Sequence, residues 1–406
     1  MTDGFDALEK RDPATRAAEQ FGRIRALIAD AKAAAPGWAA LLAEVDPASV
    51  TDLSTLPVLR KSELGEKQRS APPLGGLSVR PASDYDQLFQ SPGPLYEPGM
   101  SSARDWWRFG RALWAAGIRP SDVVLNCFAY HLTPAGHMLE AGAKAVGCPV
   151  IPGGVGNSEA QMRAAVDLGA TAYVGTPDFL KVLLDKTVEA GESLAITRAL
   201  VSGGPLFPSL RGDYADRGIA CLQCYGTADL GLIAYETMPD QPMVVDEGVV
   251  LEIVRPGTGD PVPEGEVGEV VVTTLNPDYP LFRFATGDLS AIAEGMCPSG
   301  RTGPRIKGWM GRADQTTKVK GMFVRPEQIA EILSRHQGLA KARLTVTRSA
   351  EQDTMSLQVE TADTTVAGPL AESMRAVLKL RGTVSVVPPG SLPNDGKVIE
   401  DARSYD

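Results

Sequence analysis

The chain has 406 residues, of which 43% are hydrophobic and 22% are charged. This composition is typical of a globular protein of two or three domains and excludes a mainly disordered chain. The formal net charge of −10 argues against nucleic acid as the main partner. Because the sequence has no apolar run long enough to span a membrane and no basic, apolar leader, we expect a cytoplasmic protein without a membrane partner.

The N-terminal half of the chain alternates between helix and strand signals. Asp12 followed by Pro13 predicts the start of a helix that runs to Pro36. Apolar runs predict strands at 123–128, 149–152, 172–175 and 199–201, and helical periodicity predicts helices at 138–146, 158–168 and 178–190. Strands that alternate with helices over short loops imply a largely parallel sheet.

The rest of the chain has a different pattern. Residues 240–295 carry strand signals separated by Pro/Gly turns, which predicts an antiparallel sheet or β-barrel lobe. After Gly308, helix and strand signals mix in a way that is typical of a small α+β domain. The predicted fold class is α/β: a large N-terminal domain with mainly parallel sheets and the barrel lobe (1–307), a hinge (308–314) and an α+β C-terminal lid domain (314–406).

Five cysteines are spread along the chain, and two of them, Cys221 and Cys224, have CxxC spacing. A zinc site would need a second pair at matching spacing, whereas Cys127, Cys148 and Cys297 are isolated. We therefore expect Cys221 and Cys224 to lie in a buried strand as small apolar residues rather than to form a redox pair. We predict no structural zinc.

Four glycine-containing motifs follow one another in a characteristic order. They are Tyr225–Asp229 after a predicted strand, Leu281–Asp288 after a second, Gly311–Asp314 at the start of the small domain, and Gly396-Lys397 near the C-terminus. This ordered set resembles the acyl-adenylate-forming (AMP-binding) superfamily, and most closely its phenylacetate–CoA ligase branch. Further similarity at 53–64, 153–161 and 262–269 extends the resemblance over roughly residues 50–400.

The resemblance implies an AMP site. Asp288 would bind the ribose hydroxyls with its two acceptor oxygens, Tyr225 would stack on adenine, and Arg312 would contact ribose or phosphate. The residues whose backbone would shape this pocket are Gly203, Gly204, Pro205 and Gly226.

The same resemblance implies a catalytic set. Thr227 would lie by the α-phosphate, and Asp229, at a position where the family usually has Glu, would reach phosphate oxygens through Mg²⁺. Lys397 would bridge the reacting carboxylate and the α-phosphate, where negative charge develops. Asp314 aligns with the hinge about which the small domain rotates, and Gly321 with the passage for the pantetheine of CoA.

One segment departs from the family pattern. The family's phosphate loop is rich in Ser, Thr and Gly and ends in Lys-Pro, whereas residues 90–99 are aligned with it here. Pro92 and Pro94 have no backbone N–H to donate to an anion, and Glu97 puts negative charge where the lysine would meet pyrophosphate. The AMP half of the site is therefore kept, and the pyrophosphate half is degenerate.

Three functions remain open at this point. The protein is a carboxylic acid–CoA ligase that uses MgATP, an acyltransferase that uses a preformed adenylate or thioester, or a non-catalytic module that binds AMP or acyl groups. The presence of both Asp288 and Lys397 favours an enzyme, because a scaffold has no physical need of the two together. No GxSxG signature supports a hydrolase.

The acyl substrate is indicated only by the segment after the first predicted strand. Phe128, Tyr130 and His131 fall where this branch lines its acyl pocket, and they would suit a small, aromatic carboxylic acid. His131 either hydrogen-bonds a ring substituent or serves as a wall of the pocket. The partners expected are therefore this acid and CoA, and a homodimer is left open.

Overall fold

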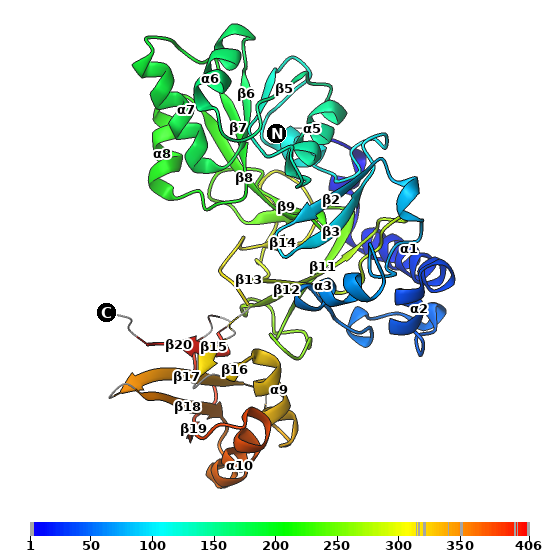
Figure 1. Ribbon diagram of the computed structural model, residues 1–406, viewed down its shortest axis with the longest axis vertical. Coiled ribbons are helices and arrows are strands. Elements are labelled where there is room, and N and C mark those ends of the chain that lie inside the picture. The colour runs from blue at the N-terminus through cyan, green and yellow to red at the C-terminus, as the bar shows by residue number, and fades with distance from the viewer. Residues whose placement is uncertain are drawn as a thin grey trace. The chain divides into compact units, whose positions relative to one another are not determined.

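The computed structural model describes residues 4–313, 315, 317–319, 322–339, 341–349, 352–393, 395 and 397–403 (Figure 1). Contacts group the chain into two compact units. The first consists of Met1–Leu251, Val272–Phe284 and Ala293–Gly308, and the second of Glu252–Val271, Ala285–Ile292 and Trp309–Asp406. The division into domains 1–307 and 314–406 stays a prediction.

The first unit begins with a helix whose start is fixed by its capping residue. Asp12 Oδ1 accepts the Thr15 N–H at 2.8 Å, and Pro13 occupies the first helical position, where no N–H partner is needed. Helix α1 spans Pro13–Ala34, and this confirms the helix predicted up to Pro36. The shorter helical segments that follow or precede it are η1 (Ala7–Lys10), α2 (Pro36–Leu41), η2 (Pro47–Ser49), η3 (Leu53–Thr55), α3 (Lys61–Ser70), η4 (Ala82–Asp84) and α4 (Gly110–Ala115).

An eight-stranded sheet runs through the first unit in the order β14-β10-β9-β8-β7-β6-β4-β5 (Figure 1). Its strands are β4 (Val124–Asn126), β5 (Val150–Pro152), β6 (Ala172–Gly175), β7 (Arg198–Val201), β8 (Ala220–Thr227), β9 (Gly231–Tyr235), β10 (Met243–Val245) and β14 (Arg305–Ile306). Neighbours from β5 to β8 pair in parallel, and those from β8 to β14 pair antiparallel. The largely parallel sheet predicted from the α/β alternation is thus confirmed.

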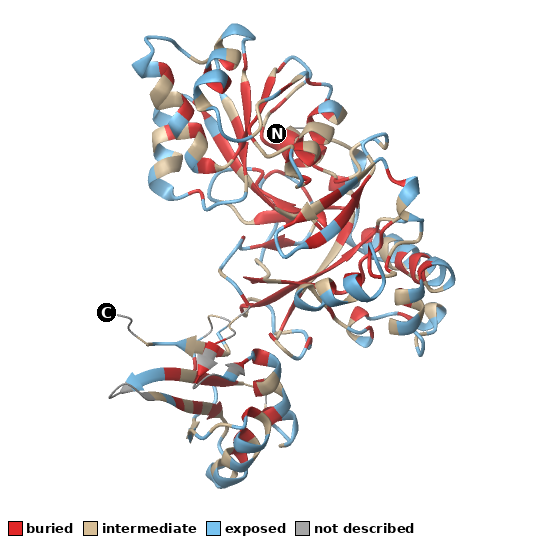
Figure 2. Cartoon of the chain, in the orientation of Figure 1, coloured by how far each residue is buried: buried red, intermediate tan, exposed pale blue. Residues whose placement is uncertain are grey.

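The two faces of this sheet are covered by different helices, because successive strand residues point to opposite sides. Val124, Leu200 and Leu222 pack in one core cluster with residues of α4 and of α5 (Ala135–Val146). Their neighbours Leu125 and Cys221 pack in another with residues of α6 (Ser158–Asp167), α7 (Pro177–Glu189) and α8 (Pro208–Asp216). The sheet strands are therefore almost continuously buried (Figure 2).

A four-stranded sheet with the order β1-β13-β12-β11 takes up most of the segment predicted as a barrel lobe. Its strands are β1 (Leu59–Arg60), β11 (Val249–Val254), β12 (Gly268–Thr274) and β13 (Phe284–Ser290). All residues of β12 are buried, which explains the apolar run Val270–Val272. Separately, β2 (Gln87–Ser91) and β3 (Leu95–Gly99) form a two-stranded hairpin.

The C-terminal part of the second unit is α+β, as predicted. A four-stranded sheet has the order β19-β18-β17-β20, and Leu344, Leu357 and Val359 from it form a core with Leu370 and Met374 of α10. The elements are β15 (Thr317–Val319), β16 (Met322–Val324), α9 (Pro326–Ser334), β17 (Ala342–Ser349), β18 (Gln352–Glu360), η5 (Thr364–Val366), α10 (Ala367–Leu378), β19 (Thr383–Val387) and β20 (Ile399–Asp401).

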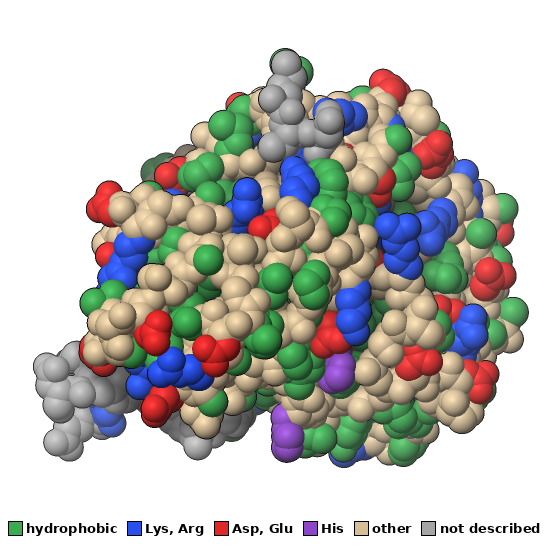
Figure 3. Space-filling model, turned by 90° about the horizontal axis from the view of Figure 1, so that it is seen from above, with side chains coloured by type: hydrophobic (Ala, Val, Ile, Leu, Met, Phe, Trp, Pro, Cys, Tyr) green, Lys and Arg blue, Asp and Glu red, His purple; other side chains and the backbone are tan. Residues whose placement is uncertain are grey.

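Two general properties of the described residues bear on function. None of their helices combines the length and the apolar character that crossing a membrane requires. On the face drawn in Figure 3, basic and acidic side chains are interspersed with apolar ones.

Candidate active site

Asp288 and Arg312, 24 positions apart, are brought together in the second unit. They form an isolated antiparallel bridge, and Arg312 Nη1 lies 2.8 Å from Asp288 Oδ1. Asp288 is only 7% exposed, whereas the Arg312 side chain is 54% exposed. The pair therefore presents a carboxylate from within the fold beside a cation at the surface, as a ligand with hydroxyl and phosphate groups requires.

The backbone around Asp288 explains how the pair forms. Gly287 has φ +75°, and a Cβ at this position would lie 2.9 Å from Arg312 Nη2, so glycine leaves room for the guanidinium. Ala313 donates its N–H to the Gly287 carbonyl at 2.8 Å, and Leu289 donates to the Gly311 carbonyl at 2.9 Å. These bonds hold residues 311–313 against the end of β13.

Trp309 belongs to the same arrangement and was missed in the sequence. Its indole Nε1–H donates to Asp288 Oδ1 at 3.1 Å, although the residue is 55% exposed. An exposed tryptophan that is bonded to a buried carboxylate can contact a ligand with its ring. Its only signal in the sequence is an aromatic residue directly before the Gly311–Asp314 motif.

The motif that starts at Tyr225 lies in the first unit, at the end of β8 and in the turn to β9. Tyr225 is 8% exposed, and Gly226 faces the Gly231 carbonyl so closely that a Cβ would lie 2.7 Å from its oxygen. Thr227 Oγ1 accepts the Leu230 N–H at 3.2 Å, so its hydroxyl already stabilises the turn. Asp229 lies in this same turn.

Gly203, Gly204 and Pro205 follow β7, the neighbour of β8 in the parallel sheet, and all three are exposed. Ser202 Oγ donates to the Cys224 carbonyl at 2.8 Å, which joins this loop to the end of β8. The carboxyl ends of parallel strands share one edge of a sheet, and ligands of open α/β sheets bind there. The residues of the first unit that the sequence predicts to contact adenine therefore lie at the carboxyl edge of the parallel strands.

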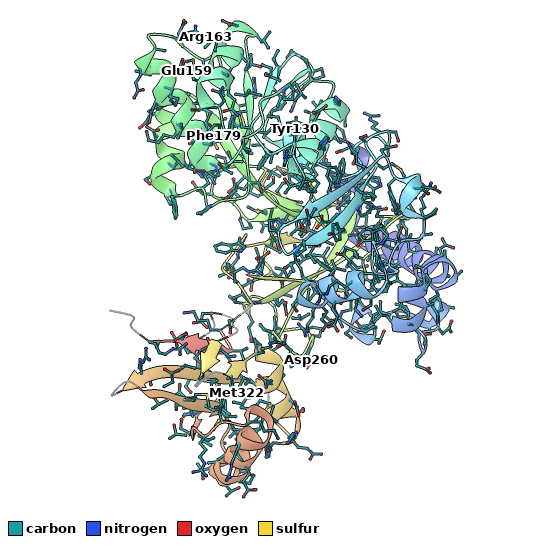
Figure 4. The ribbon with its side chains drawn as sticks, viewed as in Figure 1. Tyr130, Glu159, Arg163, Phe179, Asp260 and Met322 are labelled. Atoms are coloured by element: carbon teal, nitrogen blue, oxygen red, sulfur yellow. The ribbon has the colours of Figure 1, made fainter. Side chains whose placement is uncertain are left out.

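The predicted acyl-pocket residues follow β4, at the same sheet edge. Tyr130 receives a hydrogen bond from the buried Asn126 Nδ2 at 2.8 Å, and burial raises its pKa far above the ordinary value (Figure 4). Phe128 lies beside Gly203, where its ring would be 3.7 Å from an added Cβ. His131 is exposed. Phe128, Tyr130 and His131 thus all follow β4, and their part in an acyl pocket stays a prediction.

The segment aligned with the phosphate loop is a closed hairpin. Ser91 pairs with Leu95, so Pro92, Gly93 and Pro94 form the whole tip. The Ser91 hydroxyl donates to Glu97 Oε1, and Glu97 is 2% exposed. Burial raises the pKa of Glu97 to about 8; the nearby negative charge of Asp229 adds to this effect, whereas the Ser91 hydrogen bond and the positive charge of Lys61 oppose it.

Lys61, the first residue of α3, is a member of this cluster that was not selected from the sequence. Its Nζ lies 2.6 Å from Asp229 Oδ2, which joins residues 168 positions apart. Among the described residues, Asp229 Oδ1 and Glu97 Oε2 are buried without a hydrogen-bond partner. The cluster therefore combines two buried carboxyl groups with one lysine.

Lys397 lies in the second unit, just before β20. Its side chain is 49% exposed, and its Nζ is 3.7 Å from Glu400 Oε1. In the described part of the chain it pairs with Glu400 rather than with Asp288. Lys397 also lines a shallow pocket, together with Arg255, Lys341 and Arg343. The predicted hinge residue Asp314 and the predicted pantetheine contact Gly321 lie outside the described residues.

No group of three or more His, Cys, Asp or Glu side chains within the described ranges is arranged to hold a metal ion. All five cysteines are free and buried. Cys221 and Cys224 lie in β8, as expected for small apolar residues of a strand. The absence of a structural zinc stays a prediction.

Comparison with known proteins supports the resemblance found in the sequence. Residues 100–276 match the family model of AMP-binding enzymes. The phenylacetate–coenzyme A ligase of Thermus thermophilus is 28% identical over 365 residues, which cover 85% of this chain and 81% of the relative. The enzyme of the same name from Escherichia coli K12 is 26% identical over 377 residues, covering 86% and 84%. This chain is therefore similar to phenylacetate–CoA ligases over most of its length and to AMP-binding enzymes over residues 100–276.

Solved structures support the fold of this chain. A 2-hydroxyisobutyryl-CoA ligase, in an open conformation with its acyl-AMP and CoA, has a TM-score of 0.71 and 24% identity, covering 95% of this chain and 91% of the other. The same ligase in a post-adenylation state also gives a TM-score of 0.71. The predicted α/β class with a smaller α+β part is therefore confirmed.

Proposed function

We propose that this protein is an ATP-dependent carboxylic acid–CoA ligase of the adenylate-forming kind. The carboxylate attacks the α-phosphorus of ATP, the bond to the bridging oxygen breaks, and pyrophosphate leaves with that electron pair. The thiolate of CoA then attacks the acyl carbon of acyl-AMP and displaces AMP, so that ATP, acid and CoA give acyl-CoA, AMP and pyrophosphate. The relatives named phenylacetate–coenzyme A ligase, matched over most of their length, support this reaction.

The observation that carries the proposal is the contact between Asp288 and Arg312. Asp288 and Arg312 come from separate motifs, yet one bridge places the carboxylate and the guanidinium 2.8 Å apart. Asp288 would accept hydrogen bonds from the ribose hydroxyls of AMP, and Arg312 would stabilise the phosphate. A surface ion pair without a ligand would not need a carboxylate that is 93% buried.

Adenine and acyl group would lie at the carboxyl edge of the parallel sheet. Tyr225 would stack on adenine, with the backbone of Gly203 and Gly204 beside it. Phe128 and Tyr130 would line the acyl pocket, and their rings favour a small aromatic acid. The expected partners of the protein are therefore this acid and CoA.

Lys397 would neutralise the charge that develops between carboxylate and α-phosphate. Among the described residues, its half-exposed ammonium pairs with the carboxylate of Glu400, at 3.7 Å, so little would have to be broken for it to bind substrate. Mg²⁺ fits Asp229, because Oδ1 is a buried carboxylate oxygen without a hydrogen-bond partner among the described residues. When bound, Mg²⁺ supplies positive charge to the phosphate oxygens.

The second candidate is a protein that uses or binds a preformed adenylate. It is favoured by one observation: the hairpin tip offers two prolines without N–H groups, and Glu97 is fixed behind it by Ser91. Such a protein would bind AMP or acyl-AMP without using the triphosphate.

Pyrophosphate release separates the two candidates. Wild-type protein with MgATP, CoA and a panel of small aryl acids is expected to release pyrophosphate and AMP in equal amounts with at least one acid. Lys397→Ala is expected to bind AMP but to release neither product above background. An AMP-binding protein that releases no pyrophosphate with any acid, while it forms acyl-CoA from supplied acyl-AMP, would support the second candidate instead.

A further inference from the structure

The buried cluster around Asp229 contains two carboxyl groups and one lysine. Asp229 has a side chain that is 1% exposed, and Glu97 is 2% exposed. Each has one oxygen, Asp229 Oδ1 and Glu97 Oε2, without a hydrogen-bond partner in the described ranges. Buried polar atoms of this kind are rare in native proteins, so each of these oxygens has room for a partner such as a water, a metal ion or a ligand group.

Lys61 is the cation of this cluster. Its ammonium has three N–H donors, and the bond to Asp229 Oδ2 at 2.6 Å uses one of them. The lysine side chain is 30% exposed although its partner is almost fully buried. Asp229 therefore holds the Lys61 ammonium from its buried side. Among the described residues no other partner of this ammonium is found, so its two remaining N–H donors can bind a group from solvent.

The hairpin next to this lysine cannot supply the corresponding charge. Helix α3, which begins at Lys61, is joined to β3 by two hydrogen bonds between the Gln68 side chain and the Tyr96 backbone, at 2.7 and 2.9 Å. At the position of the family's loop lysine, β3 carries Glu97, whose carboxyl group is bonded to Ser91. The helix thus brings a lysine to the place where the hairpin has lost one.

We propose that Lys61 is a phosphate-binding residue that contacts the β- and γ-phosphates of ATP in place of a loop lysine. This role rests on the proposed ligase function. Lys61 would supply the positive charge that lets the site bind a triphosphate although Glu97 takes the place of the loop lysine. Lysine binds phosphate as a point charge and stabilises pyrophosphate as it leaves with its additional negative charge. Asp229 orients the lysine for this role.

The test compares the affinities of variants for MgATP and for AMP by calorimetric titration. Lys61→Met is expected to weaken MgATP binding by about tenfold or more and to change AMP binding less than about twofold, because AMP has no β- or γ-phosphate. Lys61→Arg is expected to restore most of the MgATP affinity. Lys67→Met, on the same helix, is the matched control and should leave both affinities unchanged. Equal losses for both nucleotides, or no loss, would overturn the proposal.

A second comparison guards against misfolding, because Lys61→Met leaves Asp229 buried without its cation. The variant Asp229→Asn needs no cation for its neutral amide. If Lys61 binds phosphate directly, Asp229→Asn will bind MgATP more tightly than the double variant Lys61→Met/Asp229→Asn. Equal affinities in this pair would overturn the proposal.

The outcome also distinguishes this inference from the proposed function. If wild-type protein binds MgATP through Lys61 but releases no pyrophosphate with any acid, the ligase function fails and the role of Lys61 stands. If wild-type protein binds AMP but not MgATP, both are overturned.

Discussion

Asp288 Oδ1 accepts hydrogen bonds from both Arg312, at 2.8 Å, and the Trp309 indole, at 3.1 Å. One carboxylate oxygen thereby fixes two side chains that are themselves more than half exposed. The carboxylate is the organising group of this part of the site, and its charge is balanced by Arg312.

Asp288→Asn is therefore expected to weaken AMP binding by about tenfold or more, because an amide offers one acceptor oxygen and no charge. Calorimetric titration with AMP measures this. Asp260→Asn, an exposed position in the same unit (Figure 4), serves as the control and should keep wild-type affinity. If both variants bind AMP as wild type does, Asp288 does not hold the ribose.

Lys397→Ala is expected to lower the rate of adenylate formation on the order of a hundredfold or more, since a charge aimed at the transition state is lost. AMP affinity should stay within about twofold, because the lysine is assigned to the reacting groups. The readout is pyrophosphate release at saturating MgATP. Lys186→Ala, on α7, is the control, and full activity of Lys397→Ala would rule out its assigned role.

Glu97 should leave a signature in the pH dependence of stability. Its pKa is raised from 4.5 to about 8 in the folded chain, so the folded state keeps a proton that the unfolded state loses. The contribution of Glu97 to the free energy of unfolding is complete below about pH 4.5 and is lost above about pH 8. Between these values it falls by up to about 1.4 kcal/mol per pH unit.

Urea unfolding between pH 5 and 8 checks this slope. The difference in unfolding free energy between wild type and Glu97→Gln should decrease steadily over that range. Asp105, whose pKa burial raises to about 6, affects both proteins alike and cancels in the difference. A difference that is independent of pH would mean that Glu97 is ionised throughout.

Cys127, Cys221 and Cys224 should be unreactive in the native protein. Burial raises the pKa of Cys127, Cys221 and Cys224 to about 12, so almost no thiolate is present at neutral pH. An aromatic disulfide reagent is expected to leave these three thiols unmodified in buffer, whereas all five cysteines react in denaturant. Rapid modification of Cys221 and Cys224 in buffer would favour the redox interpretation of their CxxC spacing.

Local sequence signals predicted the elements that depend on short-range patterns. The strand at 172–175 and the helices expected at 158–168 and 178–190 were found because a continuous apolar run or a helical period reports burial directly. The hairpin of β2 and β3 was not predicted; Pro92 and Pro94 are compatible with it because both lie in the three-residue tip, where no cross-strand N–H is required.

The missed site residues depend on long-range contacts. Lys61 meets Asp229 across 168 positions, and Trp309 meets Asp288 only because residues 311–313 fold back onto β13. Amino-acid composition and the spacing of residues within a motif do not predict such contacts. Motif resemblance could select Asp288 and Arg312, but it could not show that a lysine outside every motif lies beside Asp229.

The most direct test of the ligase account is a calorimetric titration of the purified protein with MgATP and, separately, with AMP. Both are expected to bind, because Lys61 supplies the positive charge that the hairpin lacks and Asp229 holds this lysine in place. Binding of AMP alone would contradict it, since a protein that cannot hold the triphosphate cannot form an acyl adenylate from ATP.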